Sequence, residues 1–550
     1  MYYKKLVLIL GFSIGAIYSI TSQAGSLPCT TGTIETKSGT ICGVEQEVSN
    51  TTVDAFLGIP YAKSTGGKNR WKRPKPKKSW KETYPATQFG PFCPQPISSI
   101  PSSEDCLSLN VWTPSDRPVN AKLPVMVFLH GGAFVTGGSG YPQYDGSHIS
   151  ATENVILVSL NYRLGALGFL VTAGLNGNYG FLDQQLALKW VKKNIHNFGG
   201  DPDNVTLFGQ SAGGMSVSLH LASAPSSQKL FRAGIVQSNP YSLPYQTRKE
   251  AKSIGKLFTS LLDCKNKKCL RKKSVEDILT AQNAVLYYFP PVWQNLGFLM
   301  TWMPVIDKRV LKNQPIETQF IEKPTIIGTV LDEGLTFAAY ANPTGAISAT
   351  EYEELVKIFF GEQTTTVLET YPPTPYPQLN LLSFSKLFTD YMFTCGSRYA
   401  AANSPTNGYV YHFTHLSSFN TLLSYISGVP FCSDSVCHSF DLPYVFHPKL
   451  CYIDTSGNYT CTGFTPEEEQ LSQEIMHYNA NFARYSEPND NGVIWPPFQS
   501  DNNYMEFDVP LTVKNSAEDC SLSDSIGYNL AEHFWSGLID EMNKNVKASK

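Results

Sequence analysis

This chain has almost no excess of charge of either sign, with 43 basic and 46 acidic residues. Its 550 residues carry a formal net charge of only −3, whereas a nucleic-acid partner requires a strongly basic face. Outside the N-terminus, no apolar run is long enough to span a bilayer, because Pro290, Pro291 and Gln294 interrupt the apolar segment at 284–304. Repeats of fixed period and low-complexity tracts are also missing. We therefore expect no nucleic-acid partner and no transmembrane anchor.

The N-terminus has the three parts of a secretory signal peptide. Lys4 and Lys5 form a short positive region, residues 6–20 are apolar, and Ser22-Gln23-Ala24 is a small-x-small cleavage site. The alternative, an uncleaved membrane anchor, is disfavoured because the apolar run is short for a membrane span. We predict a signal peptide at 1–24 and one mature domain at 25–550. We expect the mature domain to enter the secretory pathway and to be either secreted or held in the lumen of a secretory or storage vesicle.

Cysteine is not scarce, and its number fits this compartment. The chain contains 12 cysteines, an even number, and the secretory route is oxidising, so we expect them to be paired. Three N-x-Thr sequons, at Asn50, Asn204 and Asn458, are potential glycan acceptors. We expect Asn204 to be the poorest acceptor because it immediately precedes a buried strand.

Short apolar runs at 124–129 and 155–161 are typical of strands that are buried on both faces of a parallel or mixed sheet. Residues 182–196 place apolar side chains at helical spacing, with an acidic residue early and lysines late, which suits the helix dipole. A further apolar run follows at 205–208. Strand, helix and strand in this order indicate an α/β fold.

The strand at 205–208 leads into Gly209-Gln210-Ser211-Ala212-Gly213, a G-x-S-x-G motif followed by a helix-prone segment at 215–221. In this context the motif predicts a tight, strained turn, in which a side chain at either glycine would collide with neighbouring backbone. The turn exposes the serine at a helix N-terminus, whose dipole stabilises negative charge. We predict that Ser211 is a nucleophile; the alternative is a glycine-lined turn with an idle serine.

A second glycine pair, in His130-Gly131-Gly132-Ala133-Phe134, follows the strand at 124–129. Acyl transfer passes through an oxyanion, which preorganised N–H donors stabilise. We assign the backbone N–H groups of Gly132, Ala133 and Ala212 to this oxyanion hole. The alternative for the glycine pair is a simple tight turn.

Long stretches of the chain resemble the type-B carboxylesterase and cholinesterase family. The matching segments include residues 56–62, 104–107, 161–165 and 199–214, within a similarity that extends from residue 30 to residue 535. The resemblance implies an α/β-hydrolase fold with a large, mostly parallel central sheet and helices on both faces. It also implies a serine esterase that hydrolyses a small-molecule carboxylic ester through an acyl-enzyme. We expect a carboxylesterase-like member, not a true cholinesterase, with no cofactor and no metal.

The resemblance also supplies the other two members of a catalytic triad. The family's acid lies in a stretch that begins D-E-G and ends in phenylalanine, which is residues 332–337 here. The matching acid is Glu333, and Asp332 is its main competitor. The family's histidine corresponds to His438, which we expect to be the general base that Glu333 orients and that acts on Ser211.

Three residues depart from the family pattern. Gln210 replaces a frequent glutamate and, in our interpretation, has no chemical role. Ala133 replaces a glycine but retains the N–H that the oxyanion hole needs. Ser439 replaces the glycine after the histidine and is expected to shift that loop slightly.

The twelve cysteines are assigned in two ways. The resemblance pairs Cys93 with Cys106, Cys264 with Cys269, and Cys395 with Cys520, and it suggests buried ion pairs Arg70–Glu104 and Arg163–Asp183. Proximity in the sequence suggests Cys29–Cys42, Cys432–Cys437 and Cys451–Cys461 for the rest. An alternative zinc site made by Cys432, Cys437, His438 and His447 is disfavoured because the compartment is oxidising.

The loop between Cys93 and Cys106 bears on the substrate. In cholinesterases this loop is long and carries the tryptophan that binds the quaternary ammonium by cation–π attraction, whereas here the loop contains no aromatic residue. We therefore expect weak hydrolysis of choline esters and a neutral short- to medium-chain ester as substrate. Six aromatic residues are candidates for an apolar pocket, although we expect at least half to be core: Tyr287, Tyr288, Phe289, Trp293, Phe337 and Tyr340.

Two other functions remain open from the sequence. One is a catalytically silent adhesion or binding module, although such relatives typically lack the serine or the histidine. The other is a lumenal storage protein with incidental or no esterase activity, because an intact site does not prove physiological use. The oligomeric state is also open, since the amphipathic segment 526–543 would suit either a dimer contact or a cap on the domain.

Overall fold

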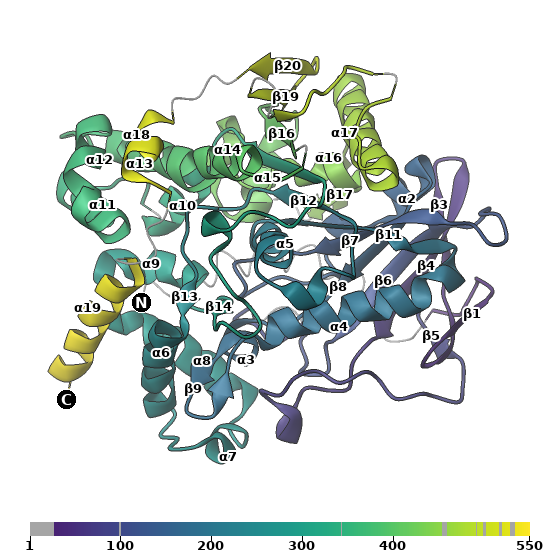
Figure 1. The fold of residues 1–550 in the computed structure, drawn as a ribbon, viewed down its shortest axis with the longest axis horizontal. Helices are drawn as coiled ribbons and strands as arrows, with labels where there is room; N and C mark the ends of the chain where they lie inside the picture. The colour runs from purple at the N-terminus through teal and green to yellow at the C-terminus, as the bar shows by residue number, and fades with distance from the viewer. Residues whose placement is uncertain are drawn as a thin grey trace.

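An 11-stranded mixed sheet forms the centre of the molecule (Figure 1). The computed structural model describes residues 27–549 except 98–100, 343, 407, 454–458, 491, 499–501, 516–519 and 529–533, so the predicted signal peptide lies outside the described residues. From edge to edge the strands are β20 (Thr512–Asn515), β19 (Asn503–Phe507), β16 (Gly408–Phe413), β15 (Thr325–Val330), β12 (Ala233–Gln237), β11 (Gly200–Gln210), β7 (Leu123–Leu129), β8 (Ile156–Leu160), β6 (Ser108–Pro114), β4 (Thr51–Pro60) and β3 (Val44–Val48).

The middle of this sheet is parallel and its edges are antiparallel. Every neighbouring pair from β19 to β8 is parallel, whereas β20, β6, β4 and β3 pair in the antiparallel sense. The expected large, mostly parallel sheet of an α/β fold is thereby confirmed. Because carboxyl ends of parallel strands meet at one edge, residues that follow β7, β11 and β15 are brought together there.

The two apolar runs that the sequence analysis predicts as strands are adjacent central strands. β7 and β8 pair in parallel, and every residue of both strands is buried. This burial explains why the two runs are apolar without alternation, since helices cover both faces of a parallel sheet. Burial of each large aliphatic side chain stabilises the fold by about 1.5–3 kcal/mol relative to exposure.

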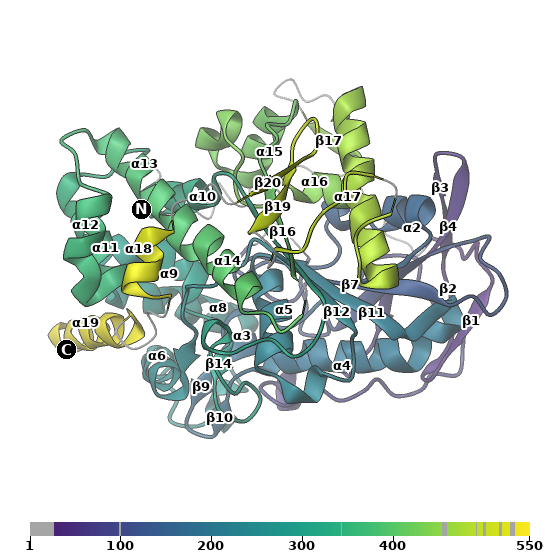
Figure 2. The same ribbon diagram turned by 45° about the horizontal axis from the view of Figure 1, so that its top comes forward.

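Helices cover both faces of the sheet. The α-helices are α2 (Ser147–Glu153), α3 (Gly165–Phe169), α4 (Tyr179–Asn194), α5 (Ala212–Ala222), α6 (Arg248–Leu261), α7 (Lys267–Leu270), α8 (Val275–Ala284), α9 (Pro291–Met300), α10 (Glu333–Ala341), α11 (Ala349–Phe360), α12 (Thr364–Thr370), α13 (Pro377–Phe388), α14 (Cys395–Ala402), α15 (Asn420–Ser427), α16 (Leu442–Phe446), α17 (Pro466–Tyr485), α18 (Ser521–Ile526) and α19 (Phe534–Ala548). α4 lies along one face of the sheet, and α2 and α17 lie together on the other (Figures 1 and 2). α4 is the predicted helix at 182–196, and it begins three residues earlier than expected.

The C-terminal helix α19 packs against the domain. Its apolar residues Phe534, Trp535, Leu538, Ile539 and Met542 are buried. The Trp535 indole N–H donates to the Pro244 carbonyl at 2.7 Å. The sequence analysis leaves open whether the segment 526–543 is a cap on the domain or a dimer contact. In its described part, the apolar face of α19 packs against the domain as a cap. No helix in this described part of the chain is both long enough and apolar enough to cross a membrane.

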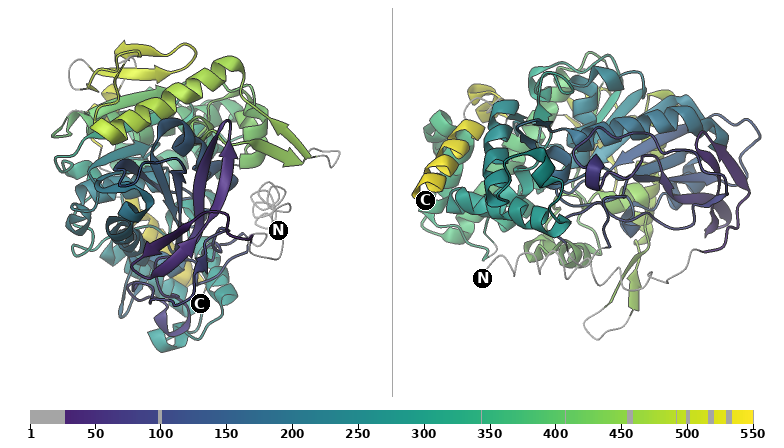
Figure 3. Two further views of the ribbon diagram at one scale, coloured as in Figure 1. Left: turned by 90° about the vertical axis from the view of Figure 1, so that its right-hand side faces the viewer. Right: turned by 90° about the horizontal axis from the view of Figure 1, so that it is seen from below.

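All 12 cysteines are joined in six disulfides. The pairs are those that the sequence analysis assigns, including Cys432–Cys437. Because both of those sulfurs are bonded to each other, they are not available as thiolate ligands, and the alternative zinc site is not formed. The Cys451–Cys461 disulfide joins the two strands of a hairpin, β17 (Leu450–Ile453) and β18 (Tyr459–Thr462). This hairpin projects from the body of the molecule (Figure 3).

The three sequons differ in their surroundings. Asn50 is exposed in the turn between β3 and β4, as a glycan acceptor requires. Asn204 lies in β11, where its amide oxygen accepts from Arg232 at 2.8 Å and its amide nitrogen donates to the Arg484 carbonyl. Both polar atoms of the Asn204 side chain are therefore engaged with protein groups. Asn458 lies outside the described residues.

Candidate active site

Ser211 occupies the sharp turn between β11 and α5. Its backbone has φ 58° and ψ −124°, a conformation that residues with a side chain rarely adopt. Its N–H donates to the Gln237 carbonyl at 3.0 Å, which fixes the turn to the neighbouring strand β12. Gln210 and Ala212 are buried on either side, whereas Ser211 is partly exposed. The turn therefore presents the serine to solvent from within a buried segment.

Two glycines make this turn sterically feasible. A Cβ on Gly213 would lie 1.9 Å from the Leu129 carbonyl oxygen, and a Cβ on Gly209 would lie 2.7 Å from the Gly213 carbonyl carbon. Real Cβ contacts of this kind do not occur at such distances. Any larger residue would therefore push α5 away from the end of β7, which is the collision that the sequence analysis expects.

The segment after β7 turns back against the serine. Gly132 has φ 99° and Ala133 has φ 52°, and the Gly132 carbonyl accepts the Thr136 N–H at 2.9 Å. A Cβ on Gly131 would lie 3.1 Å from the Ser211 Cβ, so this segment contacts the nucleophile turn. Within the described residues, the N–H groups of Gly132 and Ala133 donate to no protein acceptor.

A third N–H donor comes from the nucleophile turn itself. Ala212 is the first residue of α5, and the first N–H groups of a helix have no intrahelical partner. The three groups assigned to the oxyanion hole, on Gly132, Ala133 and Ala212, therefore belong to two segments in direct contact. Such an arrangement can stabilise negative charge on an oxygen bound beside Ser211.

Glu333 and His438 meet beyond the carboxyl end of β15. Glu333 is the first residue of α10 and is fully buried, and its Oε1 accepts the Val330 N–H at 3.0 Å. His438 lies in the turn that follows the Cys432–Cys437 disulfide, and its Nδ1 is 2.5 Å from Glu333 Oε2. The buried carboxylate accepts the Nδ1–H proton, so Nε2 is the ring nitrogen left for acid–base chemistry.

Asp332, the competing acid, has a different partner. Its carboxylate accepts the Val436 N–H at 2.9 Å, and its own N–H donates to the Val436 carbonyl. Burial raises the pKa of the Asp332 carboxyl above its usual range, with the neighbouring Glu333 charge adding to the rise. Asp332 therefore ties β15 to the segment that leads into His438, and Glu333 is the acid that reaches the imidazole.

Gln210 is the site residue that the sequence analysis missed. Its Nε2 lies 3.2 Å from His438 Nε2, although we interpreted the side chain as having no chemical role. An amide donor at this place stabilises the imidazole with its lone pair on Nε2, which is the tautomer that Glu333 also favours. The two residues are 228 positions apart, so no local pattern signals the contact.

Ser439 stands where a glycine is usual, and its backbone shows why. Its φ is 75°, in the left-handed region that costs a residue with a side chain about 1–2 kcal/mol. Its hydroxyl donates to the carbonyl of His438. Since His438 still reaches Glu333, the serine does not displace the imidazole from its acid.

One aromatic candidate adjoins this pair. Phe337 packs against the His438 ring with centroids 5.1 Å apart, and Phe393 packs on it at 5.4 Å. Phe289 and Trp293 are almost completely buried and belong to the core, whereas the Tyr287 side chain is 57% exposed. The imidazole therefore has an apolar wall on one side.

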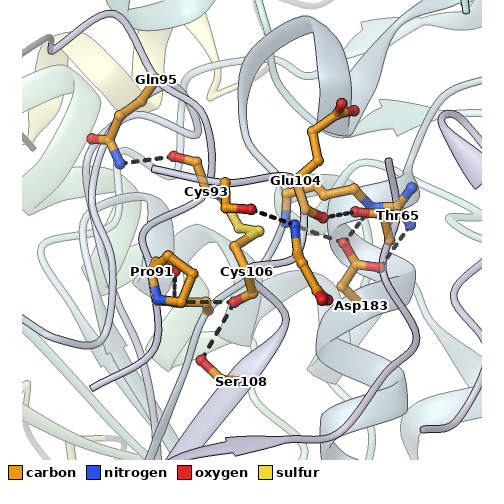
Figure 4. The surroundings of a disulfide bond; sticks show 12 residues. Thr65, Pro91, Cys93, Gln95, Glu104, Cys106, Ser108 and Asp183 are labelled. Carbon is orange, nitrogen blue, oxygen red and sulfur yellow. Dashed lines mark hydrogen bonds and ion pairs between the residues drawn. A yellow bond between two sulfur atoms is a disulfide. The ribbon is translucent and has the colours of Figure 1, made fainter. Parts of the chain in front are cut away.

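The Cys93–Cys106 disulfide closes a loop that includes Gln95 (Figure 4), and this residue contacts the segment after β7. Gln95 donates to the Gly137 carbonyl at 2.9 Å and accepts the Gly137 N–H at 3.0 Å. A Cβ on Gly137 would in turn lie 2.5 Å from the Gly131 carbonyl oxygen. The composition of this loop therefore influences the surroundings of the oxyanion segment.

Two largely buried ion pairs lie near the Cys93–Cys106 loop, and Glu104 of the first pair belongs to this loop. The Arg70 guanidinium makes two contacts with the Glu104 carboxylate, at 2.7 and 2.5 Å. Arg163 and Asp183 also make two, both at 2.7 Å, with both side chains nearly inaccessible. Removing one partner of such a pair leaves a buried charge uncompensated, so both have the structural role that we expect.

Asp441 is a further buried carboxyl near the pair. Its Oδ2 accepts the Tyr411 hydroxyl at 2.9 Å, and within the described residues its Oδ1 has no partner. Burial, aided by the negative charge of Glu333, raises the pKa of Asp441 to about 6. Asp441 therefore ionises less readily in the folded protein than in the unfolded chain.

We expect Asp441→Asn to stabilise the protein at pH 8 but not at pH 4. Because the folded-state pKa is above the unfolded value, the favourable contribution of Asp441 is complete below about pH 4 and is lost as pH rises through about 6. The asparagine amide cannot ionise, so the gain in the free energy of unfolding of the variant over the wild type should grow between pH 4 and pH 8, to at most about 3 kcal/mol. Thermal unfolding at pH 4 to 8 measures it, with Asp434→Asn as the control for loss of a charge. An equal effect at every pH would contradict the prediction.

Known proteins that resemble this chain cover most of its length. The model described as "Carboxylesterase family" matches residues 30–523. The Crystal protein of Dictyostelium discoideum is 34% identical over 521 residues, 90% of each chain. The acetylcholinesterase of Bungarus fasciatus is 34% identical over 535 residues, 88% of this chain and 84% of the relative. Among solved structures, a PNB esterase superposes with a TM-score of 0.74 at 31% identity, covering 90% of this chain and all of that one.

Proposed function

The chain belongs to the carboxylesterase family and is a carboxylic ester hydrolase, and from this premise we propose that it works through an acyl-enzyme on Ser211. His438 takes the hydroxyl proton as Ser211 Oγ attacks the ester carbonyl, and it then protonates the leaving alcohol. Glu333 holds the imidazole in the Nδ1–H tautomer and stabilises the imidazolium. Water activated by His438 then hydrolyses the acyl-serine.

The negative charge of each tetrahedral intermediate develops on the former carbonyl oxygen. In this proposal it is held by the N–H groups of Gly132, Ala133 and Ala212. Such donors act strongly because they are fixed before the reaction, and removing one typically costs about 10²–10³ in turnover. In this proposal Gln210 donates to Nε2 and so holds His438 in the tautomer with its lone pair on Nε2. When the reaction begins, the Ser211 hydroxyl replaces the amide as the partner of that lone pair.

The single observation that carries this proposal is the position of the Glu333–His438 pair. The two groups are 2.5 Å apart, and His438 Nε2 faces the residue that precedes Ser211 in its strained turn. The acid and the base thus come from separate segments and meet beside Gln210, the neighbour of the proposed nucleophile in the sequence. A structural ion pair alone would not need a partly exposed serine with a φ of 58° beside it.

Hydrolysis of p-nitrophenyl acetate and butyrate by the purified, disulfide-intact mature chain tests the proposal. We expect release of p-nitrophenol that a fluorophosphonate abolishes at one equivalent per chain, with the label on Ser211. A folded chain without activity or labelling would contradict it. That outcome would favour the second function that the sequence leaves open, a lumenal storage or binding protein with incidental or no esterase activity.

We expect choline esters to be poor substrates. The Cys93–Cys106 loop, which Gln95 anchors beside the oxyanion segment, contains no aromatic residue, and a quaternary ammonium bound over an aromatic ring gains about 2 kcal/mol or more when desolvated. The kcat/KM for butyrylcholine should therefore fall at least about tenfold below that of 3,3-dimethylbutyl butyrate, its neutral isostere. Equal values would refute this specificity.

The same proposal places the enzyme in the secretory pathway. Six disulfides fit an oxidising compartment, and Asn50 is exposed for glycosylation. Release from the cell and storage in a vesicle lumen are both consistent with these features. Cell fractionation with a glycosidase shift distinguishes the two.

A further inference from the structure

A second group of ligand-type side chains lies outside the proposed esterase site, where three helices meet. His148 is on α2, His447 ends α16, and Glu469 is in the first turn of α17, and these helices lie together in Figure 2. One ligand atom from each side chain lies within 4.8 Å of the other two. The proposed ester chemistry uses none of the three. We propose that they form a Zn²⁺ site that ties α2 to α16 and α17.

His447 is held in one orientation. Its ring lies between the rings of His148 and Phe464, with centroids 4.0 and 4.5 Å away. Its Nδ1 is 2.8 Å from the Ser472 hydroxyl, which itself donates to the Tyr444 carbonyl at 3.1 Å. Since that hydroxyl proton is already used, the hydroxyl accepts the Nδ1–H proton. Nε2 is therefore the ring nitrogen with a free lone pair.

That lone pair faces a carboxylate. His447 Nε2 lies 3.1 Å from Glu469 Oε2, and Gln473 donates to the other carboxylate oxygen at 3.2 Å, which leaves Oε2 turned toward the ring. Two acceptors at this distance require either a shared proton or a metal cation between them. A proton on Nε2 would join only His447 and Glu469, whereas a divalent ion would also be coordinated by the imidazole of His148.

The donor set favours zinc. Two imidazoles and one carboxylate are a ligand combination that binds Zn²⁺ with bonds near 2.0–2.2 Å, which keeps ligand atoms roughly 3.4 Å apart in a tetrahedron. The His447 and Glu469 ligand atoms already lie near this spacing, at 3.1 Å, and the His148 ligand atom lies within 4.8 Å of both. The His148 and His447 rings are stacked, 29° from parallel, so His148 must turn about its side-chain bonds to direct its lone pair at the same ion. Glu469 is 40% exposed, which leaves a fourth position open to water.

A bound ion would stabilise the region behind the proposed base. α16 begins at Leu442, shortly after His438, and His447 ends it. Zn²⁺ at one hundred times its Kd is expected to raise the Tm by roughly 2–3 °C for a chain of this size. The readouts are binding and stability, so the site can be tested independently of esterase activity.

The experiment measures zinc binding to the full mature chain after treatment with a chelator. Equilibrium dialysis with metal analysis should find one Zn²⁺ per chain, and Co²⁺ in its place should give the intense visible absorption of a tetrahedral ion. His148→Ala and Glu469→Gln should each weaken zinc binding by at least about tenfold and abolish the Tm rise. Both side chains are partly exposed, so these variants test the site even if His447→Ala does not fold.

The matched control is His477→Ala on the same helix. His477 also lies between carboxylates, with Nδ1 3.1 Å from Glu153 and Nε2 2.6 Å from Asp490, but the two contacts use different nitrogens. We expect this variant to retain one Zn²⁺ and the full Tm rise. Absence of stoichiometric binding, unchanged binding in His148→Ala, or a loss confined to His477→Ala would each overturn the proposal.

Discussion

Ser211→Ala is expected to lower kcat for p-nitrophenyl butyrate by at least about 10⁴-fold, while the Tm changes by less than about 1 °C. The alanine removes the Oγ that forms the acyl bond and nothing that holds the turn, because the backbone bond to Gln237 and both glycine contacts remain. Residual hydrolysis should come from the oxyanion donors and from binding alone. Steady-state kinetics and thermal unfolding of the two proteins measure the effect.

Ser238→Ala is the matched control for this substitution. Ser238 directly follows the neighbouring strand β12 and also has a positive φ, 49°, but its side chain is completely buried. A buried hydroxyl cannot meet an ester, so this variant should retain activity. If Ser211→Ala kept more than about one tenth of the wild-type kcat after host esterases were removed, the acyl-serine mechanism would be wrong.

The part of the site that depends on neighbouring residues was predictable from the sequence. The motif with Gly209, Ser211 and Gly213 comes immediately after an apolar strand in the sequence. Only a tight turn explains why both glycines are needed. The parallel centre of the sheet was predictable for a similar reason. β7 and β8 are apolar without alternation because both of their faces are covered.

The part that depends on distant contacts was not predictable from local pattern. Glu333 and His438 were placed by family resemblance, because no spacing rule connects residues 105 positions apart. The contact of Gln210 with His438 was missed, since nothing near either residue indicates the other. His148, His447 and Glu469 likewise come from three separate segments. His447 had been considered with Cys432 and Cys437, which instead form a disulfide.

The backbone conformation of Ser439 is another property that side-chain identity does not reveal. The sequence shows a serine in place of glycine, and this predicts a shifted loop. The structure shows that the serine adopts the conformation of a glycine, with φ 75°, and that the imidazole keeps its partner. Local strain is tolerated here because the Cys432–Cys437 disulfide and the Asp332–Val436 contacts fix the preceding segment.

Glu333→Gln is expected to lower kcat by about 10³–10⁴-fold, whereas Asp332→Asn should lower it by less than about tenfold. The glutamine has the same shape as the glutamate but carries no charge, so it cannot stabilise the imidazolium that forms when His438 takes the serine proton. Its amide also donates to Nδ1 in one orientation, which moves the imidazole proton to Nε2 and blocks the base. Asparagine at 332 still accepts the Val436 N–H and leaves the imidazole unaffected.

Kinetics of the two adjacent variants therefore identify the acid without reference to any relative. Both carboxylates lie at the end of β15, both substitutions remove one charge without changing the shape, and the two positions differ in whether the side chain reaches His438. A loss confined to Glu333→Gln assigns the role to Glu333. A comparable loss in Asp332→Asn would mean that the negative field of this strand end matters more than the hydrogen bond to Nδ1, and the triad would have to be reassigned.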